Sequence, residues 1–491
     1  MAECDTADIC RLSSATFIII GGGIAGVSCA EQLAFEQPDE SIILISASPF
    51  VKVAKNVIKI SKRLEDFDVG EESYSFLENR HANCTVYFAS AVEIDSLKHT
   101  VLLSDSKVLN YKKLCICTGA VPKIISRSNP YILGIRDTET VEVFQRKLLD
   151  ASRVIVVGNG GLAIEIVYEI ENCDIIWAIK DKSVGSTFFD AGAAKFFLPC
   201  LNESKQKETA PSKRLKYTLE GNPQSSVMGS ALGPDWSTKI NMKGKTLEKR
   251  NVHVEYECEV KNIHSRDEFL QQDLKEITFQ TSKSKNIWPV YVELTNGSVF
   301  GCDFVISATG VIPNTSLLLK NELLIADDGG IAVNDQMKTN LEDIFAAGDA
   351  CTASWSLSEH WFQMRLWTQA RQMGAYAAKC MSSELQGETA VLDICFDLFT
   401  HVTKFFGYKV VLLGLYNGQK LGNDYEIIVR TSERREYAKV VMKNGRMQGA
   451  VLIGETDLEE TFENLILNSL DLTPYGEDIL NPDVDIEDYF D

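Results

Sequence analysis

The chain has 491 residues, 45% of them apolar and 24% charged, as expected of a globular protein with two or three domains. Its net charge of −20 is concentrated at one end, because residues 455–491 hold 13 acids and no Lys or Arg, which leaves only −7 on the rest. An acidic chain without a basic stripe argues against direct nucleic-acid binding, and no apolar run approaches the roughly 20 residues of a membrane-spanning helix.

The cysteines and the first residues bear on the compartment. Thirteen cysteines occur at irregular spacings, which indicates reduced thiols rather than a disulfide framework. The opening sequence MAECDTADIC is acidic where a secretory or mitochondrial targeting segment would be basic. We expect a cytoplasmic protein that also has access to the nucleus, with no metal site and no membrane span.

A strand followed by a glycine turn comes next. Residues 16–20 are β-branched and aromatic, as in a strand buried on both faces of a parallel sheet, and the sequence GGGIAG follows. In such a turn Gly21 permits the tight bend, Gly23 lets the backbone approach a pyrophosphate, and Gly26 lets the helix pack closely against the strand. The pattern predicts a dinucleotide site.

Four further residues are candidate contacts of this first dinucleotide. Ile24 and Ala25 begin the helix, whose N-terminal amides favour phosphate. The next strand, residues 40–46, ends at Ser46, where the pattern expects an acid to accept the ribose hydroxyls. A serine hydroxyl makes a weaker hydrogen bond than a carboxylate, and Lys52 just beyond it is a candidate for the adenosine half or its phosphates.

The same unit occurs a second time. Residues 153–165 read RVIVVGNGGLAIE, a β-branched strand followed by Gly158, Gly160 and Ala163 as GxGxxA, with Glu165 as a further candidate contact on the helix. Two such units are more specific than one. They predict two bound dinucleotides, or one dinucleotide and a second turn that has lost its ligand.

The end of the second unit does not decide between NADH and NADPH. The following strand, CDIIWAIK, ends at Lys180, where an acid favours NADH and a basic residue favours the extra phosphate of NADPH. Asp181 follows directly, and a solvated strand end is an equally good interpretation of Lys180. The preference between NADH and NADPH stays open.

Three more segments each bring a buried strand to a glycine turn. They are CICTGAVP, VISATGVIPNT and TNLEDIFAAGDACT, with turns at Thr118-Gly119, Thr309-Gly310 and Gly348-Asp349. Each Thr-Gly turn taken alone is an ordinary strand terminator. With the two GxGxx turns they give five landmarks whose order resembles that of the FAD-dependent class I pyridine nucleotide-disulfide oxidoreductases and their ferredoxin-reductase-like relatives.

The resemblance implies an α/β fold with two Rossmann-like domains and a C-terminal α+β domain with an antiparallel sheet. The expected boundaries are 12–135 and 300–390 for a discontinuous FAD domain, 136–299 for an inserted NAD(P)H domain, and 391–491 for the C-terminal domain. A loop-rich insertion is expected at about 202–248, where Lys, Ser, Gly and Pro are frequent.

The resemblance also implies roles for the landmark residues. The first glycine turn matches the FAD pyrophosphate turn and the second the NAD(P)H turn. Asp349 matches an aspartate that binds the ribityl or phosphate region of the flavin, and the two Thr-Gly turns match connectors near the cofactors. Residues 360–378 match a helix whose N-terminus approaches the flavin pyrimidine, where its dipole would stabilise negative charge.

One family feature is absent from the sequence. Relatives that reduce disulfides through their own dithiol carry two cysteines separated by two or four residues, whereas the nearest pairs here are Cys115 with Cys117 and Cys4 with Cys10. Buried cysteines on a strand are commonly plain apolar filler. The proton-donating histidine and glutamate near the C-terminus of those relatives also have no match, so we expect electrons to leave the flavin directly.

The C-terminal region instead resembles that of the monomeric ferredoxin-reductase-like members. Residues 436–454 alternate apolar and polar around a Lys-Asn-Gly turn, a strong hairpin signal. The aromatic-rich segment CFDLFTHVTKFFG is the nearest match to a strand that covers the flavin, with Phe399 and His401 as candidate pocket residues. A core strand with a solvated histidine is the alternative. Residues 457–470 are expected to form an amphipathic helix.

These observations predict an FAD-dependent enzyme of redox metabolism or oxidative-stress defence, in which NADH or NADPH reduces the flavin. Its acceptor is open between a quinone, oxygen, a small carrier and a partner protein's thiols. A redox-sensing interaction protein with slow flavin reoxidation is the alternative. We expect a monomer, with the insertion or the acidic tail as the place where a protein partner would bind.

Overall fold

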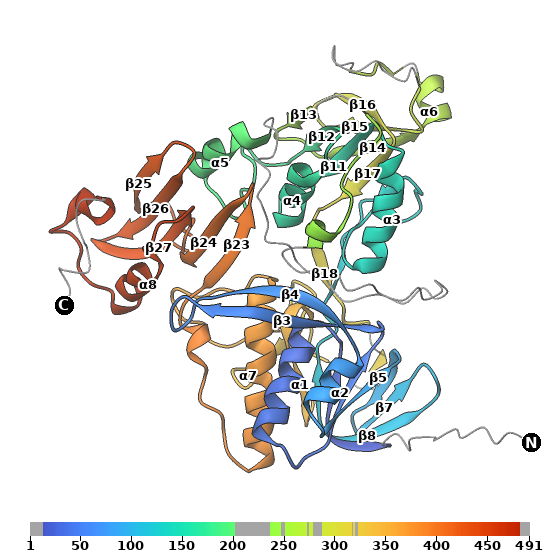
Figure 1. The fold of residues 1–491 in the computed structure, drawn as a ribbon, viewed down its shortest axis with the longest axis vertical. Coiled ribbons are helices and arrows are strands. Elements are labelled where there is room, and N and C mark those ends of the chain that lie inside the picture. Colours follow the sequence, from blue (N-terminus) through green and yellow to red (C-terminus); the bar gives the residue numbers. More distant parts are fainter. Residues whose placement is uncertain are drawn as a thin grey trace, which may run out of the picture.

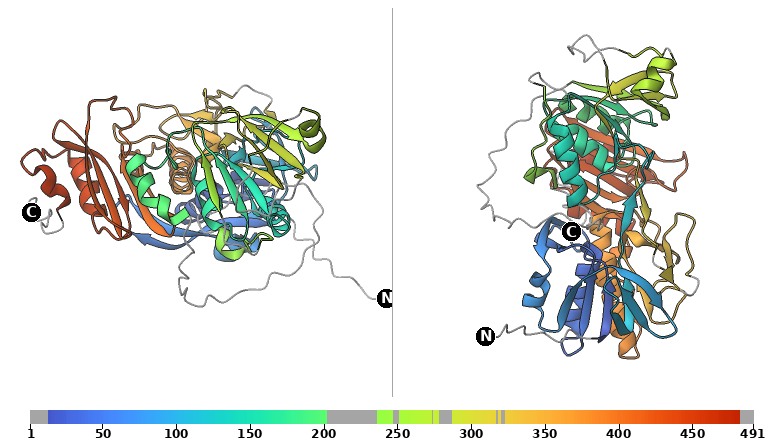
Figure 2. Two further views of the ribbon diagram at one scale, coloured as in Figure 1. Left: turned by 90° about the horizontal axis from the view of Figure 1, so that it is seen from above. Right: turned by 90° about the vertical axis from the view of Figure 1, so that its right-hand side faces the viewer.

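The computed structural model describes residues 13–201, 236–246, 251–272, 274–277, 287–316, 318–319 and 323–481. Two α/β units lie one above the other in Figure 1, and the C-terminal antiparallel sheet lies to one side. Figure 2 shows the same fold from two further directions. In the part of the chain that the structure describes, no helix has both the length and the apolar character to span a membrane.

The first unit is built around a mixed sheet in the order β19-β6-β7-β8-β1-β2-β5, with β21 also paired to β8. Its strands are β1 (Ser14–Ile20), β2 (Ile42–Ser46), β5 (Cys84–Phe88), β6 (Ala91–Asp95), β7 (Thr100–Leu103), β8 (Val108–Ile116), β19 (Leu318–Leu319) and β21 (Ile344–Ala346). β1 is parallel to both neighbours, with Ile18 opposite Ile43 on β2 and Leu114 on β8. Such a central strand is buried on both faces, which explains its unbroken apolar sequence.

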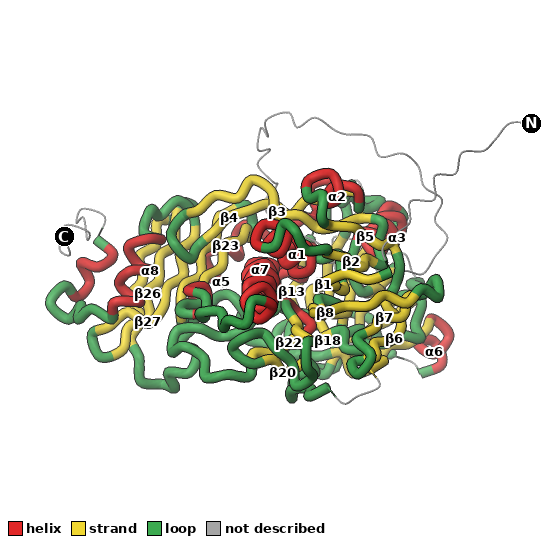
Figure 3. The backbone as a smooth tube through the Cα atoms, turned by 90° about the horizontal axis from the view of Figure 1, so that it is seen from below, coloured by secondary structure: helices red, strands yellow, loops and turns green. Residues whose placement is uncertain are grey.

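Two helices of the first unit pack side by side against this sheet, as Figure 3 shows. They are α1 (Ile24–Glu36) and α7 (Trp367–Leu385), while the short α2 is Ser75–Arg80. The helices approach closely because Gly374 faces the backbone of Ala25, leaving no room for a side chain. A long hairpin, β3 (Phe50–Lys59) with β4 (Glu65–Ser73), and the small pair β20 (Ile331–Val333) and β22 (Cys351–Ala353) complete the unit.

The second unit has a five-stranded parallel sheet in the order β10-β17-β11-β12-β13. These strands are β10 (Ile132–Leu133), β11 (Arg153–Val157), β12 (Asp174–Ala178), β13 (Val252–Glu255) and β17 (Phe304–Ser307). An antiparallel sheet of β14 (Val260–Ser265), β15 (Val290–Leu294) and β16 (Val299–Cys302) adjoins it, and the helices are α3 (Thr138–Leu149), α4 (Gly161–Glu169), α5 (Ala191–Phe197) and α6 (Arg266–Gln271). The sheet thus includes β10 and β17, which lie outside the expected limits of 136 and 299.

The C-terminal region forms an antiparallel sheet in the order β23-β24-β27-β26-β25. Its elements are β23 (Thr400–Phe405), β24 (Tyr408–Gly414), β25 (Glu426–Ser432), β26 (Glu436–Lys443), β27 (Arg446–Ile453) and α8 (Glu459–Asn468). The predicted Lys-Asn-Gly hairpin is confirmed, with Asn444 and Gly445 at positive φ of 50° and 70°. The predicted amphipathic helix is also confirmed, and it packs Phe462 and Ile466 against the sheet.

Candidate functional site

The first glycine turn joins β1 to α1 as the sequence pattern predicts. Gly21 has φ +123°, and a side chain there would overlap the carbonyl of Cys117. A side chain on Gly26 would overlap the Gly21 carbonyl, so this residue permits the close helix packing. At Gly23, the N-cap of α1, no described residue apart from the adjacent backbone has an atom within 4 Å of the place of a Cβ. The turn therefore leaves open space beside the N-terminus of α1.

Ser46 and Lys52, which are expected to contact the adenosine of the first dinucleotide, both interact with other residues of the protein. The Ser46 hydroxyl donates to the Ser48 carbonyl at 2.8 Å and packs against Gly22. The buried Lys52 forms an ion pair with Glu71. Ser46 and Lys52 both line the cavity described below. Because the Ser46 proton is donated to the backbone, this hydroxyl offers a ribose its oxygen as an acceptor, which is the role of the acid that the pattern expects.

The second glycine turn repeats the geometry of the first. Gly158 has φ +131° and faces the carbonyl of Ala308. At Gly160, the N-cap of α4, no atom of the described residues beyond the adjacent backbone lies within 4 Å of the place of a Cβ. Ala163 is completely buried in the core. The intervening Asn159, which sequence reasoning missed, donates to Asp181 Oδ2 at 2.8 Å and accepts from the Gly185 amide at 2.6 Å.

The contact between Asn159 and Asp181 bears on the question of NADH or NADPH. Since Asp181 already accepts this hydrogen bond, its carboxylate is directed toward the turn. Lys180 is exposed at the end of β12 and lines the cavity. On α4, Glu165 also lines the cavity, and its Oε2 accepts a hydrogen bond of 2.7 Å from Trp236 Nε1.

Both glycine turns open into one continuous cavity of ≈ 1210 Å³. The predicted residues that line it are Gly21, Gly23, Ile24, Ala25, Ser46, Lys52, Thr118, Gly119, Gly158, Gly160, Glu165, Lys180, Thr309, Gly310, Asp349 and His401. Gly26, Ala163 and Gly348 do not line it and instead permit close packing at its edge, since a Cβ on Gly348 would lie 2.7 Å from the Cβ of Ala25. The structure thus brings residues from both halves of the sequence to one cavity.

The two Thr-Gly turns are connected through the short antiparallel ribbon of β9 (Ala120–Pro122) and β18 (Val311–Pro313). Thr118 Oγ1 donates to the Asn314 carbonyl at 2.6 Å, and Thr309 Oγ1 donates to the Lys123 carbonyl at 2.7 Å. Each threonine is thus bonded to the segment that leads from the other turn. The connector positions the two units on either side of the cavity.

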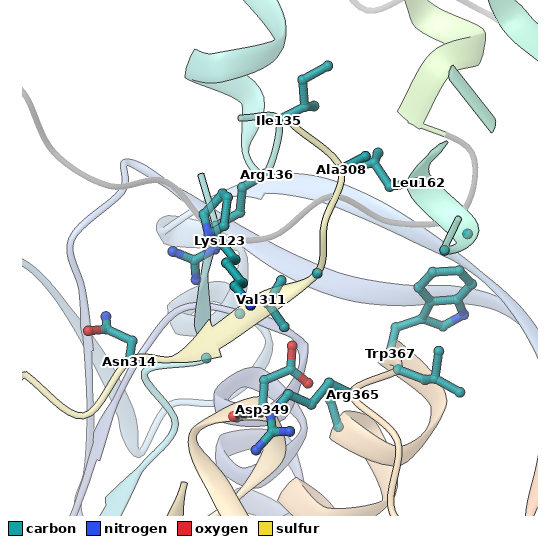
Figure 4. Close-up of a pocket in the computed structure, with 18 of the residues that line it drawn as sticks. Lys123, Ile135, Arg136, Leu162, Ala308, Val311, Asn314, Asp349, Arg365 and Trp367 are labelled. Carbon is teal, nitrogen blue, oxygen red and sulfur yellow. Dashed lines mark hydrogen bonds between the residues drawn. The ribbon is translucent and has the colours of Figure 1, made fainter. Parts of the chain in front are cut away.

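Asp349 lies on the cavity wall among basic side chains that sequence reasoning missed. Figure 4 shows Asp349 and Arg365 beneath β18, with Lys123 and Arg136 on one side and Trp367 on the other. Burial raises the pKa of the Asp349 carboxyl, while Arg365 and Arg136 act in the opposite direction. Arg365 Nε also donates to the Asp349 carbonyl at 3.1 Å. This group offers one carboxylate and cationic donors to a polar, phosphate-containing ligand.

β23 supplies the cavity wall opposite the second turn. His401, Thr403 and Phe405 alternate along this strand and all line the cavity. His401 Nδ1 lies 3.1 Å from Thr368 Oγ1, and burial lowers the pKa of His401 to about 3, so the ring is neutral at physiological pH. The Thr403 hydroxyl is buried without a hydrogen-bond partner among the described residues.

The expectation for Phe399 is wrong in the structure. Phe399 does not line the cavity; it is completely buried and stacks on Phe362 with ring centroids 4.3 Å apart. It precedes β23 and its amide donates to the His360 carbonyl, so the chain has not yet entered the strand that faces the cavity. On β23 itself, Thr403 lines the cavity two residues after His401, on the same face of the strand.

The predicted helix at 360–378 begins later than expected. α7 starts at Trp367, because the side chain of Gln369 holds the preceding segment in a non-helical path. Gln369 accepts from the Met364 amide at 2.7 Å and donates to the Phe362 carbonyl at 2.9 Å. The helix N-terminus therefore lies at the cavity, with Trp367 in its lining.

Cys115 and Cys117 do not have the setting of a reactive dithiol. Their sulfur atoms are 3.5 Å apart and both residues are buried. Hydrogen bonding to Cys115 and burial raise the pKa of the Cys117 thiol well above its ordinary value. A redox-active thiol needs a lowered pKa and access to its partner, so the filler interpretation fits better. Cys4 and Cys10 lie outside the described residues.

The cavity fits the cofactors that the sequence predicts. Gly23 and Gly160 leave two spaces that a Cβ would fill, each at a helix N-terminus where phosphate is favoured. The Thr403 hydroxyl is an orphaned polar group that a ligand would satisfy. The missing acid at Ser46 is the one departure, and it affects the ribose rather than the pyrophosphate.

Comparison with known proteins agrees with this geometry. Residues 15–374 match the family model described as pyridine nucleotide-disulphide oxidoreductase, and residues 401–470 match the rubredoxin NAD+ reductase C-terminal domain. The proteins called pyridine nucleotide-disulfide oxidoreductase domain-containing protein 1 from Rattus norvegicus and Homo sapiens are each 53% identical to this chain, over 97% of it and 98% of each relative. The resemblance predicted from sequence is confirmed.

Solved structures show the same fold at low sequence identity. A ferredoxin reductase from Rhodopseudomonas palustris gives a TM-score of 0.66 at 17% identity, covering 97% of this chain and 99% of that one. The covalent putidaredoxin reductase–putidaredoxin complex gives 0.65 at 15% identity, covering 97% and 98%. The expected fold class, two α/β units with an antiparallel C-terminal sheet, is confirmed, as are the expected cofactors of the family, FAD with NADH or NADPH.

Proposed function

Because the chain belongs to the pyridine nucleotide-disulphide oxidoreductase family, we propose that it is an NAD(P)H-dependent flavoprotein oxidoreductase that needs no CxxC or CxxxxC dithiol of its own. The single observation that supports this most is that two pyrophosphate-type turns, Gly21–Gly26 and Gly158–Ala163, open into one cavity. Two dinucleotides held in one cavity can approach each other without a carrier. Bound FAD would accept hydride from NAD(P)H and supply the electrons to an acceptor.

In this proposal the chain's own residues bind and align. The amides at the N-termini of α1 and α4 would hold the two pyrophosphates, and Asp349 would accept a hydrogen bond from the ribityl or phosphate region of bound FAD. The neutral His401 and the Thr403 hydroxyl form a polar wall opposite the second turn. Hydride transfer needs alignment rather than an acid–base pair, so rate depends on how these walls position the rings.

The acceptor is proposed by chemical class alone. The candidates are a quinone, oxygen, a small electron carrier and the thiols of a partner protein. One structural neighbour is a reductase covalently joined to its protein partner, putidaredoxin. For this chain we propose that a partner would bind through the 202–248 insertion, of which the structure describes residues 236–246, or through the acidic tail at 455–491, of which it describes residues 455–481. We propose a monomer located in the cytoplasm and nucleus.

Anaerobic titration tests the proposal. The purified protein, saturated with FAD, is mixed with NADH or NADPH and its flavin absorbance is followed, after which air or an acceptor is admitted. Bleaching of the flavin followed by many turnovers with an acceptor supports an oxidoreductase. A protein that binds no flavin, or whose flavin stays oxidised with both nucleotides, contradicts the proposal.

A redox sensor is the second candidate. It is favoured by Trp236, because this residue at the end of the insertion contacts Glu165 in the cavity and so connects the site with the insertion. In a sensor the reduced flavin and the oxidised nucleotide would stay together for minutes in air. The same experiment distinguishes the two, since rapid reoxidation with turnover excludes the sensor.

A further inference from the structure

The segment that returns from the insertion is fixed to the second unit. Met242 is buried in the core, and its carbonyl accepts from the Glu171 amide at 2.8 Å. The Gly244 amide donates to the Glu171 carbonyl at 2.8 Å, and the Lys245 amide donates to the Ala151 carbonyl at 2.8 Å. These backbone bonds hold residues 242–245 against the end of α4 and α3. They anchor the chain just C-terminal to the 3-10 helix Trp236–Lys239.

Trp236 is the residue of this segment that reaches the cavity. It lies in a short 3-10 helix, Trp236–Lys239, and its ring packs partly buried against the core of the second unit. Its indole Nε1 donates to Glu165 Oε2 at 2.7 Å, and both residues line the cavity. Indole has a single donor and no acceptor, so this hydrogen bond fixes both the indole and one oxygen of the carboxylate.

The position of Glu165 indicates which half of a nucleotide it would meet. With the pyrophosphate at Gly160, the adenosine half extends toward the end of β12, near Lys180. The nicotinamide half must then extend the other way, where the cavity continues to Trp367 and His401. Glu165 lies one helical turn after the first residue of α4 and lines the same cavity as Trp367 and His401, so we assign it to the nicotinamide half.

The indole forms a wall of the cavity and does not fill it. With Trp236 in place the cavity still measures ≈ 1210 Å³, more than the about 300–1,000 Å³ usual for a single ligand. A flat aromatic ring next to a carboxylate is a good site for a planar cation. The oxidised nicotinamide ring is such a cation, whereas the reduced ring is neutral.

We propose that Trp236 is a positioning residue of the nicotinamide site, which holds the Glu165 carboxylate so that the oxidised nicotinamide is bound in preference to the reduced one. This inference rests on the proposed function. It extends that function, because preferential retention of the oxidised nucleotide prolongs the life of the complex formed after hydride transfer.

The test measures equilibrium binding to the FAD-containing, oxidised protein. NAD+ is compared with 1,4,5,6-tetrahydro-NAD, a neutral reduced analogue that cannot donate hydride, by calorimetry and by the perturbation of the flavin spectrum. Trp236→Phe removes the donor and keeps an aromatic ring. We expect about tenfold weaker NAD+ binding, as for loss of a hydrogen bond to a charged group, and less than twofold change for the analogue.

Glu165→Gln is the matched variant, and it should weaken NAD+ to a similar degree. The double variant should then be no worse than either single one, because both remove the same interaction. If Trp236→Phe weakened the binding of both ligands equally, the role of Trp236 would be merely structural and the inference would be overturned. Tighter NAD+ binding would also overturn it, because it would show that the indole blocks the site. Unchanged binding of both ligands would also overturn it.

The proposed function can fail separately. If the wild-type flavin is not reduced by NADH or NADPH, the enzyme proposal fails whatever the variants do. If it is reduced and Trp236→Phe behaves as wild type, only the inference about Trp236 fails.

Discussion

Replacing Gly160 by Ala separates binding at the second turn from stability. Gly160 has φ −88°, which alanine adopts without strain, and within the part of the chain that the structure describes only the adjacent backbone lies within 4 Å of the added Cβ. The change should leave the free energy of unfolding equal or raise it by about 0.4–1 kcal/mol, because the unfolded chain loses freedom. The methyl group would instead project into the space where the nucleotide pyrophosphate must lie.

The loss of nucleotide affinity caused by this methyl group can be estimated from the known cost of overpacking. An extra methyl in a fitted contact costs about 1–3 kcal/mol, which corresponds to roughly 5- to 150-fold weaker nucleotide binding. Flavin content should stay at the wild-type level, and the rate of flavin reduction at low NAD(P)H should fall in proportion. Thermal unfolding, flavin absorbance and anaerobic stopped-flow reduction measure the three quantities on one preparation.

Gly23→Ala is the matched control, because Gly23 occupies the equivalent place at α1, with φ −74° and no neighbour. It should lower flavin affinity and leave nucleotide binding by the remaining flavin-loaded protein unchanged. Gly26→Val, whose side chain would overlap the Gly21 carbonyl, should lose flavin together with stability. Normal nucleotide binding by stable Gly160→Ala protein would refute the assignment of the second turn.

Three further predictions concern the cavity wall and its support. Thr403→Val should not destabilise the cofactor-free protein, because the buried hydroxyl that it removes has no hydrogen-bond partner among the described residues, yet it should weaken cofactor binding. The control Thr400→Val removes a 3.0 Å hydrogen bond to the Arg63 carbonyl and should cost about 1 kcal/mol of unfolding free energy in a denaturant titration. Burial lowers the pKa of His401 to about 3, so below pH 6.5 the unfolded state binds a proton that the folded state does not. Between pH 7 and 5 the wild-type protein should therefore lose up to about 2 kcal/mol more unfolding free energy than His401→Gln. Equal losses in the two proteins would contradict this. Lys439→Ala should lower the free energy of unfolding by about 3 kcal/mol, because it removes the 2.9 Å ion-pair partner of Asp190. Recovery of stability in the double variant Lys439→Met with Asp190→Asn would confirm this cause. Equal unfolding midpoints for wild type and Lys439→Ala would refute it.

Local patterns in the sequence predict the elements that carry them. Glycines at fixed spacing after a β-branched strand predict the turns at Gly21 and Gly158, because only glycine tolerates their positive φ and close carbonyl contacts. The Asn444-Gly445 hairpin is predictable for the same reason. In each case the residues that determine the turn lie within a few positions of the turn itself.

The rest of the site depends on contacts between distant segments. Trp236 meets Glu165 across 71 residues, and Thr118 bonds a carbonyl 196 residues away. The late start of α7 depends on a side-chain hydrogen bond from Gln369, which competes with helix formation but has no distinctive spacing. Phe399 was misplaced because aromatic residues on both sides of the strand start look alike until the register of β23 is known.

The ribbon of β9 and β18 has a mechanical consequence. The chain crosses between the two α/β units twice, and the crossings are joined to each other by strand pairing and by the hydroxyls of Thr118 and Thr309. A pair of joined crossings resists sliding of one unit over the other. The C-terminal sheet ties both units as well, because Arg63 of the first unit forms an ion pair with Glu463 and Asp190 of the second unit forms one with Lys439. The gap between the units is therefore held by this sheet in addition to the ribbon.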